Sequence, residues 1–242
     1  MSEETPNASY ARLHHVRAHE YVADQLRREI TLRLIHPGDS LPPERELTRM
    51  FGVGRLTVQK AIAILVAEGV AEKRRGRSGG TFILDTAADR RGMKDTLARI
   101  GQNRSLILDA LSFRFEVEPV AVAVACRRRT TADLGRMEDA SRQLAQAVTE
   151  AQMMKYDTEF HLAVVAGTHN RFFEQTAEQI RMALNDVLWI LPGSDLWMER
   201  TRDEHGAIQG AIEAGDAAKG RRAALSHIGH TDQSVRAVLA SL

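Results

Sequence analysis

Apolar side chains recur every three or four residues along most of this chain, the spacing that places them on one face of an α-helix. The first such segment is residues 16–35, whose apolar positions are Val22, Leu26, Ile30 and Leu34. Pro37 and Gly38 follow directly, and neither residue suits the interior of a helix. We therefore expect a helix over residues 16–35.

Two further helical patterns lie within residues 41–69 and are separated by a glycine-containing turn at residues 52–54. The first is short and begins at Pro43, because proline suits the first turn of a helix. The second is longer and ends at Gly69. Their inward faces are predicted to carry Leu47 and Met50, and Val58, Ile62 and Leu65. A short helix, a tight turn and a longer helix together predict a helix-turn-helix.

The segment VAEKRRGRSGGTFI, residues 70–83, predicts a β-hairpin with a basic, glycine-rich tip. Lys73, Arg74, Arg75 and Arg77 supply positive charge, and the glycines allow the backbone to approach a phosphate or a minor groove. Taken alone, such a hairpin is as often a solvated turn. Directly after a helix-turn-helix, it favours the wing of a winged-helix domain.

The remainder of the chain is also helical by pattern and composition. Aromatic residues make up only 5% of the sequence, and strong helix formers dominate it. The predicted C-terminal helices cover residues 105–127, 131–150, 152–168, 170–191, 196–214 and 216–240. We therefore predict a mainly α protein with a flexible tail (1–15), a winged-helix domain (16–84), a linker with a short helix (85–98) and an all-helical bundle of six or seven helices (99–242).

Composition and charge narrow the class further. Hydrophobic residues form 43% of the chain and charged residues 27%, which is typical of a globular protein. Cys126 is the only cysteine, so no intrachain disulfide can form, and the longest apolar runs fall far short of the roughly 18 residues that a membrane helix needs. We therefore expect a cytoplasmic protein with no membrane partner. Residues 1–84 carry 13 basic and 10 acidic residues, which permits DNA binding without requiring it.

Residues 41–83 resemble the GntR family of bacterial transcription regulators, because they combine a helix start, a turn, a recognition helix and a wing in the family's order. The resemblance implies a winged-helix domain that binds a short palindromic operator of double-stranded DNA as a homodimer. It also implies DNA contacts from Arg45, Arg55, Thr57, Gly79 and Gly80. The guanidinium of Arg55 has the fork that suits guanine O6 and N7.

Two positions depart from the family pattern. Gly54 stands where the family usually has serine, and Gln59 stands where it often has arginine. Glutamine pairs better with adenine than with guanine, so we expect the operator to differ from the commonest family site at the base that faces Gln59. Arg77 joins the predicted DNA contacts because of its charge at the wing tip.

The C-terminal part carries a second pattern, formed by histidines on inward helix faces. Asp157 and His161 lie one helical turn apart, and His205 and His227 lie on apolar faces of two later helices. A mostly apolar core should not hold three unpaired imidazoles, because each buried polar group needs a partner. A divalent metal would bind all of them, and three imidazoles with a carboxylate suit zinc, nickel or another first-row ion. The remaining C-terminal histidines, His169 and His230, are interpreted as surface residues.

This pattern resembles the FCD domain, the effector-binding domain of the FadR subgroup of GntR regulators. The matching residues are Asp157, His161, His205, His227, the pair Arg114 and Glu118, and residues 167–170. The resemblance implies an all-helical domain that dimerises and binds a small carboxylate over the metal, for which zinc is our first expectation. Arg114 is a predicted effector contact, and an ion pair with Glu118 explains it equally well. Asn170 is a second predicted contact, for which a helix cap is the simpler explanation.

The sequence therefore predicts a DNA-binding regulator and not an enzyme. We expect a repressor that a small organic acid releases and that lies at the nucleoid when bound to DNA. Two alternatives stay open. The metal could be purely structural, or its open position could activate water as in a zinc hydrolase. No general base is evident beside the histidines, and the complete DNA-binding module argues against the hydrolase.

Overall fold

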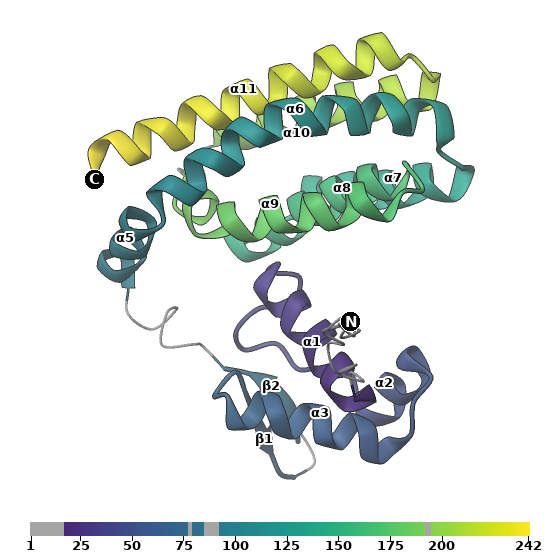
Figure 1. The fold of residues 1–242 in the computed structure, drawn as a ribbon, viewed down its shortest axis with the longest axis vertical. Coiled ribbons are helices and arrows are strands. Elements are labelled where there is room, and N and C mark those ends of the chain that lie inside the picture. The colour runs from purple at the N-terminus through teal and green to yellow at the C-terminus, as the bar shows by residue number, and fades with distance from the viewer. Residues whose placement is uncertain (1–16, 77–78, 85–91, 192–194) are drawn as a thin grey trace, which may run out of the picture.

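The computed structural model describes residues 17–76, 79–84, 92–191 and 195–242 (Figure 1). Within these ranges the chain is mainly helical, as the sequence predicts, with one two-stranded hairpin. The predicted tail, residues 1–15, lies outside the described residues. Figure 1 shows the N-terminal helices and the hairpin as one body and the later helices as a larger bundle beside it.

The N-terminal body is a helix-turn-helix with a wing. Its elements are α1 (Ala18–Thr31), α2 (Glu44–Phe51), α3 (Arg55–Ala67), β1 (Ala71–Arg74) and β2 (Gly80–Ile83). The two strands pair antiparallel, with Ala71 opposite Ile83. The turn between α2 and α3 begins at Gly52, whose φ of 63° lies in the left-handed region that favours glycine. The predicted inward residues Leu47, Val58, Ile62 and Leu65 are all buried in its core.

Two details of this body differ from the sequence prediction. Met50 is 63% exposed, because Phe51, one full turn after Leu47, packs against the core in its place. Helix α1 ends at Thr31 and not at residue 35, because Arg33 adopts a left-handed φ of 60° that an α-helix cannot continue.

The C-terminal body is an all-helical bundle. Its elements are α5 (Gly92–Gln102), α6 (Arg104–Arg128), α7 (Thr131–Gln146), α8 (Glu150–Ala166), α9 (Arg171–Trp189), α10 (Asp195–Ala214) and α11 (Ala217–Ser241). The residues that begin these helices explain several of the boundaries. Thr130, Thr149 and Asp216 each accept a hydrogen bond from a backbone N–H in the first turn of the helix that follows. Helix α5 runs across the predicted boundary between the linker, which was expected to end at residue 98, and the bundle, which was expected to begin at residue 99.

The bundle is closed by α6 and α11, which pack along each other. Their approach is close at Gly220, where an added Cβ would lie 2.9 Å from Cγ1 of Val122 and 3.0 Å from Sγ of Cys126. Cys126 is a small buried residue of this core, as predicted. None of the described helices is by itself long and apolar enough to cross a membrane, and the bent pair of α2 and α3 passes only by combined length and composition.

Candidate metal centre and nucleic-acid interface

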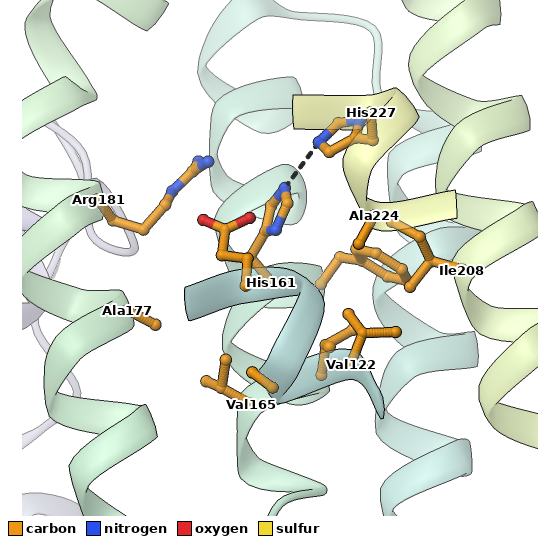
Figure 2. A pocket seen from close by; sticks show the side chains of 12 residues that line it. Val122, His161, Val165, Ala177, Arg181, Ile208, Ala224 and His227 are labelled. Atoms are coloured by element: carbon orange, nitrogen blue, oxygen red, sulfur yellow. Dashed lines mark hydrogen bonds between the residues drawn. The ribbon is translucent and has the colours of Figure 1, made fainter. Parts of the chain in front are cut away.

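Three histidines from three helices meet inside the bundle. His161 lies on α8, His205 on α10 and His227 on α11, and all three are buried. One ring nitrogen of each lies within 4.8 Å of the others, and Nε2 of His161 lies 3.2 Å from Nε2 of His227 (Figure 2). The fold thus brings together three residues that lie far apart in the sequence.

Asp157 borders this cluster from one turn earlier on α8. Its Oδ1 lies 3.5 Å from Nε2 of His205 and 3.9 Å from Nε2 of His161. Its Oδ2 accepts a hydrogen bond of 2.6 Å from Nη2 of Arg181. One carboxylate oxygen therefore faces the histidines, and the other is held by an arginine that the sequence alone did not single out.

Burial determines the protonation of these groups. Desolvation lowers the pKa of His205 to about 3 and lowers the pKa of His161 well below its ordinary value. Burial opposes ionisation of Asp157, but the charge of Arg181 and the hydrogen bond from its guanidinium outweigh it and hold the pKa of the carboxyl below its ordinary value. At neutral pH these residues offer neutral imidazoles and an ionised carboxylate, the forms that bind metal ions.

The donor set fits a divalent metal. Both ring nitrogens of His205 are buried without a hydrogen-bond partner, a costly state for polar atoms that nothing binds. Ligand atoms about 2.1 Å from one ion lie about 3.0–3.4 Å apart in octahedral or tetrahedral arrangements. The shortest separations here, 3.2 and 3.5 Å, need little adjustment to match. Phe160 stacks on the ring of His205 at a centroid distance of 4.0 Å and restricts its rotation.

A second carboxylate, that of Glu204, is hydrogen-bonded to His227 on the side of the ring away from His161. Oε2 of Glu204 lies 2.9 Å from Nδ1 of His227. An ionised carboxylate only accepts hydrogen bonds, so Nδ1 carries the proton and Nε2 is left to bind a metal. His169 is exposed and His230 is partly exposed, as expected of surface residues, and each is also bonded to a carboxylate: His230 to Glu204 and His169 to the buried Asp133.

Two cavities flank the cluster, and His161, Arg181 and His227 line both of them. Arg114 lines the more polar cavity and is only 1% exposed. Its Nε donates a 2.6 Å hydrogen bond to Oε1 of Glu118, while its Nη1 has no partner. The ion pair weighed in the sequence is therefore present, and one guanidinium nitrogen remains for a ligand.

The effector contact predicted for Asn170 is not supported. Its side chain accepts a 3.0 Å hydrogen bond from the backbone N–H of Phe172 and caps α9. It lines neither of the two cavities. The simpler explanation, a helix cap, therefore accounts for this residue, because a residue before a helix must satisfy the free N–H groups of the first turn.

The predicted DNA-contacting residues lie around Glu44, at the start of α2. Oε2 of Glu44 accepts hydrogen bonds from Nε of Arg55 at 3.2 Å and from Nε2 of Gln59 at 2.9 Å, and Oε1 lies 3.4 Å from Nζ of Lys73 in the wing. The hydrogen bond from Gln59, aided by those from Arg55 and Lys73, lowers the pKa of Glu44. Arg45 is exposed nearby on α2, and Thr57 is half-buried in the first turn of α3.

A basic groove of about 690 Å³ runs between α3 and the wing and is lined by Arg55, Lys73 and Arg74 among others. Gly79 and Gly80 also line it. At Gly79 an added Cβ would lie 2.6 Å from the carbonyl oxygen of Arg74, so no larger residue fits this turn. Arg77 lies outside the described residues. Such a groove suits the phosphate backbone of DNA.

Helix α9 connects the histidine site to the N-terminal body. Besides Arg181, it carries Glu178, which accepts a 2.6 Å hydrogen bond from Nε of Arg28 on α1. It also carries Asn185, whose Nδ2 donates a 2.6 Å hydrogen bond to the carbonyl oxygen of Thr31. Residues 178, 181 and 185 share one face of α9 by their spacing. One helix face therefore contacts both bodies of the protein.

A winged helix joined to a helical domain that buries a histidine cluster defines the class of DNA-binding regulators with a separate ligand-binding domain. Comparison with known proteins agrees with this class. Residues 18–83 match the family of bacterial regulatory proteins called gntR, and residues 109–230 match the FCD domain. The chain belongs to the GntR family, as its sequence predicted, and carries the FCD domain in its C-terminal part. It is a DNA-binding transcription regulator.

The relatives of the chain are regulators too. It is 27% identical over 239 residues to the HTH-type transcriptional regulator RmpR of Mycobacterium gastri, a match covering 94% of this chain and 84% of RmpR. It is 28% identical over 227 residues to the L-lactate dehydrogenase operon regulatory protein of Escherichia coli K12, with 88% and 84% covered. The solved structure of McbR/YncC from E. coli has the same fold, with a TM-score of 0.51, 18% identity, and 91% and 98% covered.

Proposed function

We propose that the protein is a repressor that binds a palindromic operator as a homodimer and is released by a small carboxylate or hydroxy acid bound over a divalent metal. One observation carries this proposal. Three buried histidines and Asp157 lie beside two buried cations with partnerless nitrogens, Nη1 of Arg114 and Nε of Arg181. Buried cationic nitrogens favour an anionic oxygen ligand, because leaving them unpaired is costly. Since such a protein acts on the chromosome, we place it in the cytoplasm.

Four side chains would hold the metal: His161, His205, His227 and Asp157 through Oδ1. Zinc is our first choice and nickel the second, because imidazole and carboxylate ligands suit both. When bound, the ion would act as a Lewis acid that accepts electron pairs from the carboxylate and hydroxyl oxygens of the organic effector. Binding of Asp157 through one oxygen is supported by Arg181, which occupies Oδ2.

The switch would run through α9. Arg181 contacts Asp157 at the proposed metal site, and Glu178 and Asn185 on the same helix face contact α1. An acid that draws Arg181 away from Asp157 would shift α9 and with it the position of α1. A ligand can move this equilibrium only by its differential affinity for the two arrangements, and such coupling typically amounts to about 1–3 kcal/mol.

On the DNA side, Arg55 and Gln59 would read base edges, while Arg45, Thr57 and the wing would contact the backbone and the minor groove. Glu44 supports this assignment, because its carboxylate holds Arg55 and Gln59 side by side at the N-terminal end of α3. In DNA, Arg55 would exchange the carboxylate for a base or a phosphate.

The test compares the purified wild-type protein with His161→Ala. Metal content is measured by mass spectrometry, and DNA affinity is measured on duplexes selected from a random library. The expected result is loss of metal and of the acid response in His161→Ala with DNA affinity retained. His19→Ala, a histidine of α1, is the control and should behave as wild type.

A wild-type protein that binds no divalent metal, even when one is added, would rule out the proposal. If chelation lowered the melting temperature but no organic acid changed DNA affinity, the metal would be purely structural. Turnover of an ester or amide by the zinc-loaded protein would instead revive the hydrolase alternative.

A further inference from the structure

The cavity on the apolar side of the histidine cluster is lined mainly by apolar side chains, although it shares His161, Arg181 and His227 with its neighbour. Eight of its twelve lining residues are alanine, valine, isoleucine or phenylalanine. Figure 2 shows Val122, Val165 and Ala177 at one end of this cavity, away from Arg181 and His227 at the other. All the apolar lining residues are buried.

The polar lining atoms of this cavity are largely occupied. Oε1 of Glu118 accepts from Arg114, Nε2 of His161 pairs with His227, and Nη2 of Arg181 donates to Asp157. Besides the ring nitrogens of His205, the partnerless nitrogens near the site are Nη1 of Arg114 and Nε of Arg181, and both are donors on cations. They suit a carboxylate, whereas a hydroxyl placed between Val122, Val165 and Ala177 would meet only apolar side chains.

The size of the cavity limits what can enter it. Its volume of about 20 Å³ is little more than one water molecule needs. Without movement of the lining side chains it therefore admits a group of about methyl size, and a longer hydrocarbon tail requires these apolar side chains to move. A longer chain that carries several hydroxyls would bury polar groups without partners, at a cost of about 1–3 kcal/mol for each.

We infer that the effector is a short-chain 2-hydroxy acid with an unsubstituted hydrocarbon tail, and not a polyhydroxylated sugar acid. This inference rests on the proposed function. The carboxylate and the 2-hydroxyl lie on the metal and on Arg114, and the tail enters the apolar cavity along Val122 and Val165. An apolar pocket rejects an added hydroxyl by a factor of about 100 at most, so the preference for the hydrocarbon tail is 10–100-fold.

The experiment is isothermal titration calorimetry on the zinc-loaded full-length protein with two acids of equal carbon number. They are 2-hydroxybutanoate and its tail-hydroxylated counterpart threonate (2,3,4-trihydroxybutanoate). The expected result is a Kd for 2-hydroxybutanoate that is 10–100-fold lower. A Kd for threonate that equals or falls below it would overturn the inference and leave the proposed function intact. Failure of every acid in a wider panel to bind would overturn both.

Two valine-to-threonine variants test where the preference arises, because this substitution adds a hydroxyl with little change of shape. Val165 lines the apolar cavity, and Val165→Thr should reduce the ratio of the Kd for threonate to the Kd for 2-hydroxybutanoate at least threefold. Val187→Thr lies on α9 in the other part of the core, lines neither cavity, and should leave the ratio unchanged. An unchanged ratio in Val165→Thr would overturn the placement of the tail. If Val165→Thr does not fold, the comparison of the two acids on the wild type decides alone.

Discussion

Glu204→Gln tests how much the hydrogen bond to a proposed metal ligand, His227, contributes to metal affinity while the ligand itself is kept. Glu204 does not face the proposed ion, but its Oε2 lies 2.9 Å from Nδ1 of His227. Glutamine keeps the size of the side chain and one acceptor oxygen while removing the negative charge. It also replaces the second oxygen by an NH₂ group, which only donates, so one side chain no longer accepts from Nδ1 of both His227 and His230.

The expected magnitude follows from this geometry. A hydrogen bond to a charged group contributes about 1.5–3 kcal/mol and a neutral one about 0.5–1.5 kcal/mol, so the substitution removes about 1–2 kcal/mol. Each 1.4 kcal/mol corresponds to about a tenfold change in an equilibrium constant. Metal affinity should therefore fall about 5–30-fold, which overlaps the lower part of the 10–100-fold range typical of residues that hydrogen-bond a metal-binding histidine.

The assay is a zinc titration in competition with a chelating dye, with Glu213→Gln as the matched control. Glu213 lies on the same helix, α10, and is exposed. The control should bind zinc as wild type does. An affinity in Glu204→Gln within twofold of wild type, with normal melting behaviour, would refute the claim that Glu204 orients His227. A loss of more than about a thousandfold would mean that Glu204 itself binds the ion.

Three further outcomes are expected. Gly220→Ala should lower the melting temperature, because the added Cβ would lie 2.9 Å from a valine of α6. Gly229→Ala on the same helix meets open space and should raise the melting temperature. Equal shifts of the two melting temperatures in calorimetry would contradict the packing of α6 against α11. Glu178→Gln breaks the ion pair with Arg28 and should weaken the acid-dependent change in DNA affinity without changing metal affinity; a full response measured by fluorescence anisotropy would exclude this route. Gln59→Arg should move the base preference toward guanine in a binding-site selection, and an unchanged selection would contradict base reading at that position.

The helices were predictable because their signals are local. Apolar spacing set the faces, and residues such as Pro43 and Gly69 marked the ends. The prediction that Met50 faces the core was wrong because, in a helix of 8 residues, the third and fourth positions after Leu47 are almost equally placed to face the core. Only packing against α3 chose Phe51 over Met50.

The site was predictable only in part. The metal-binding candidates carry a recognisable chemistry, and buried histidines stand out in an apolar pattern. Arg181 and Glu204 could not be recognised, because a charged residue on a helix is usually exposed to solvent. Only the fold shows which residue lies opposite each of them. Glu204 lies 23 residues from His227, and Arg181 lies 24 residues from Asp157. Nothing in the local pattern specifies those pairings, and the same holds for the contacts between α9 and α1.

The most direct test of the central claim is the affinity of the zinc-loaded protein for a selected DNA duplex, measured by fluorescence anisotropy with and without an acid that binds in calorimetry. We predict that the acid weakens DNA binding by at least about fivefold in the wild type. We also predict that His161→Ala binds the same duplex with no response to the acid. An unchanged wild-type affinity with the metal and acid sites filled, or an equal response in His161→Ala, would contradict the account.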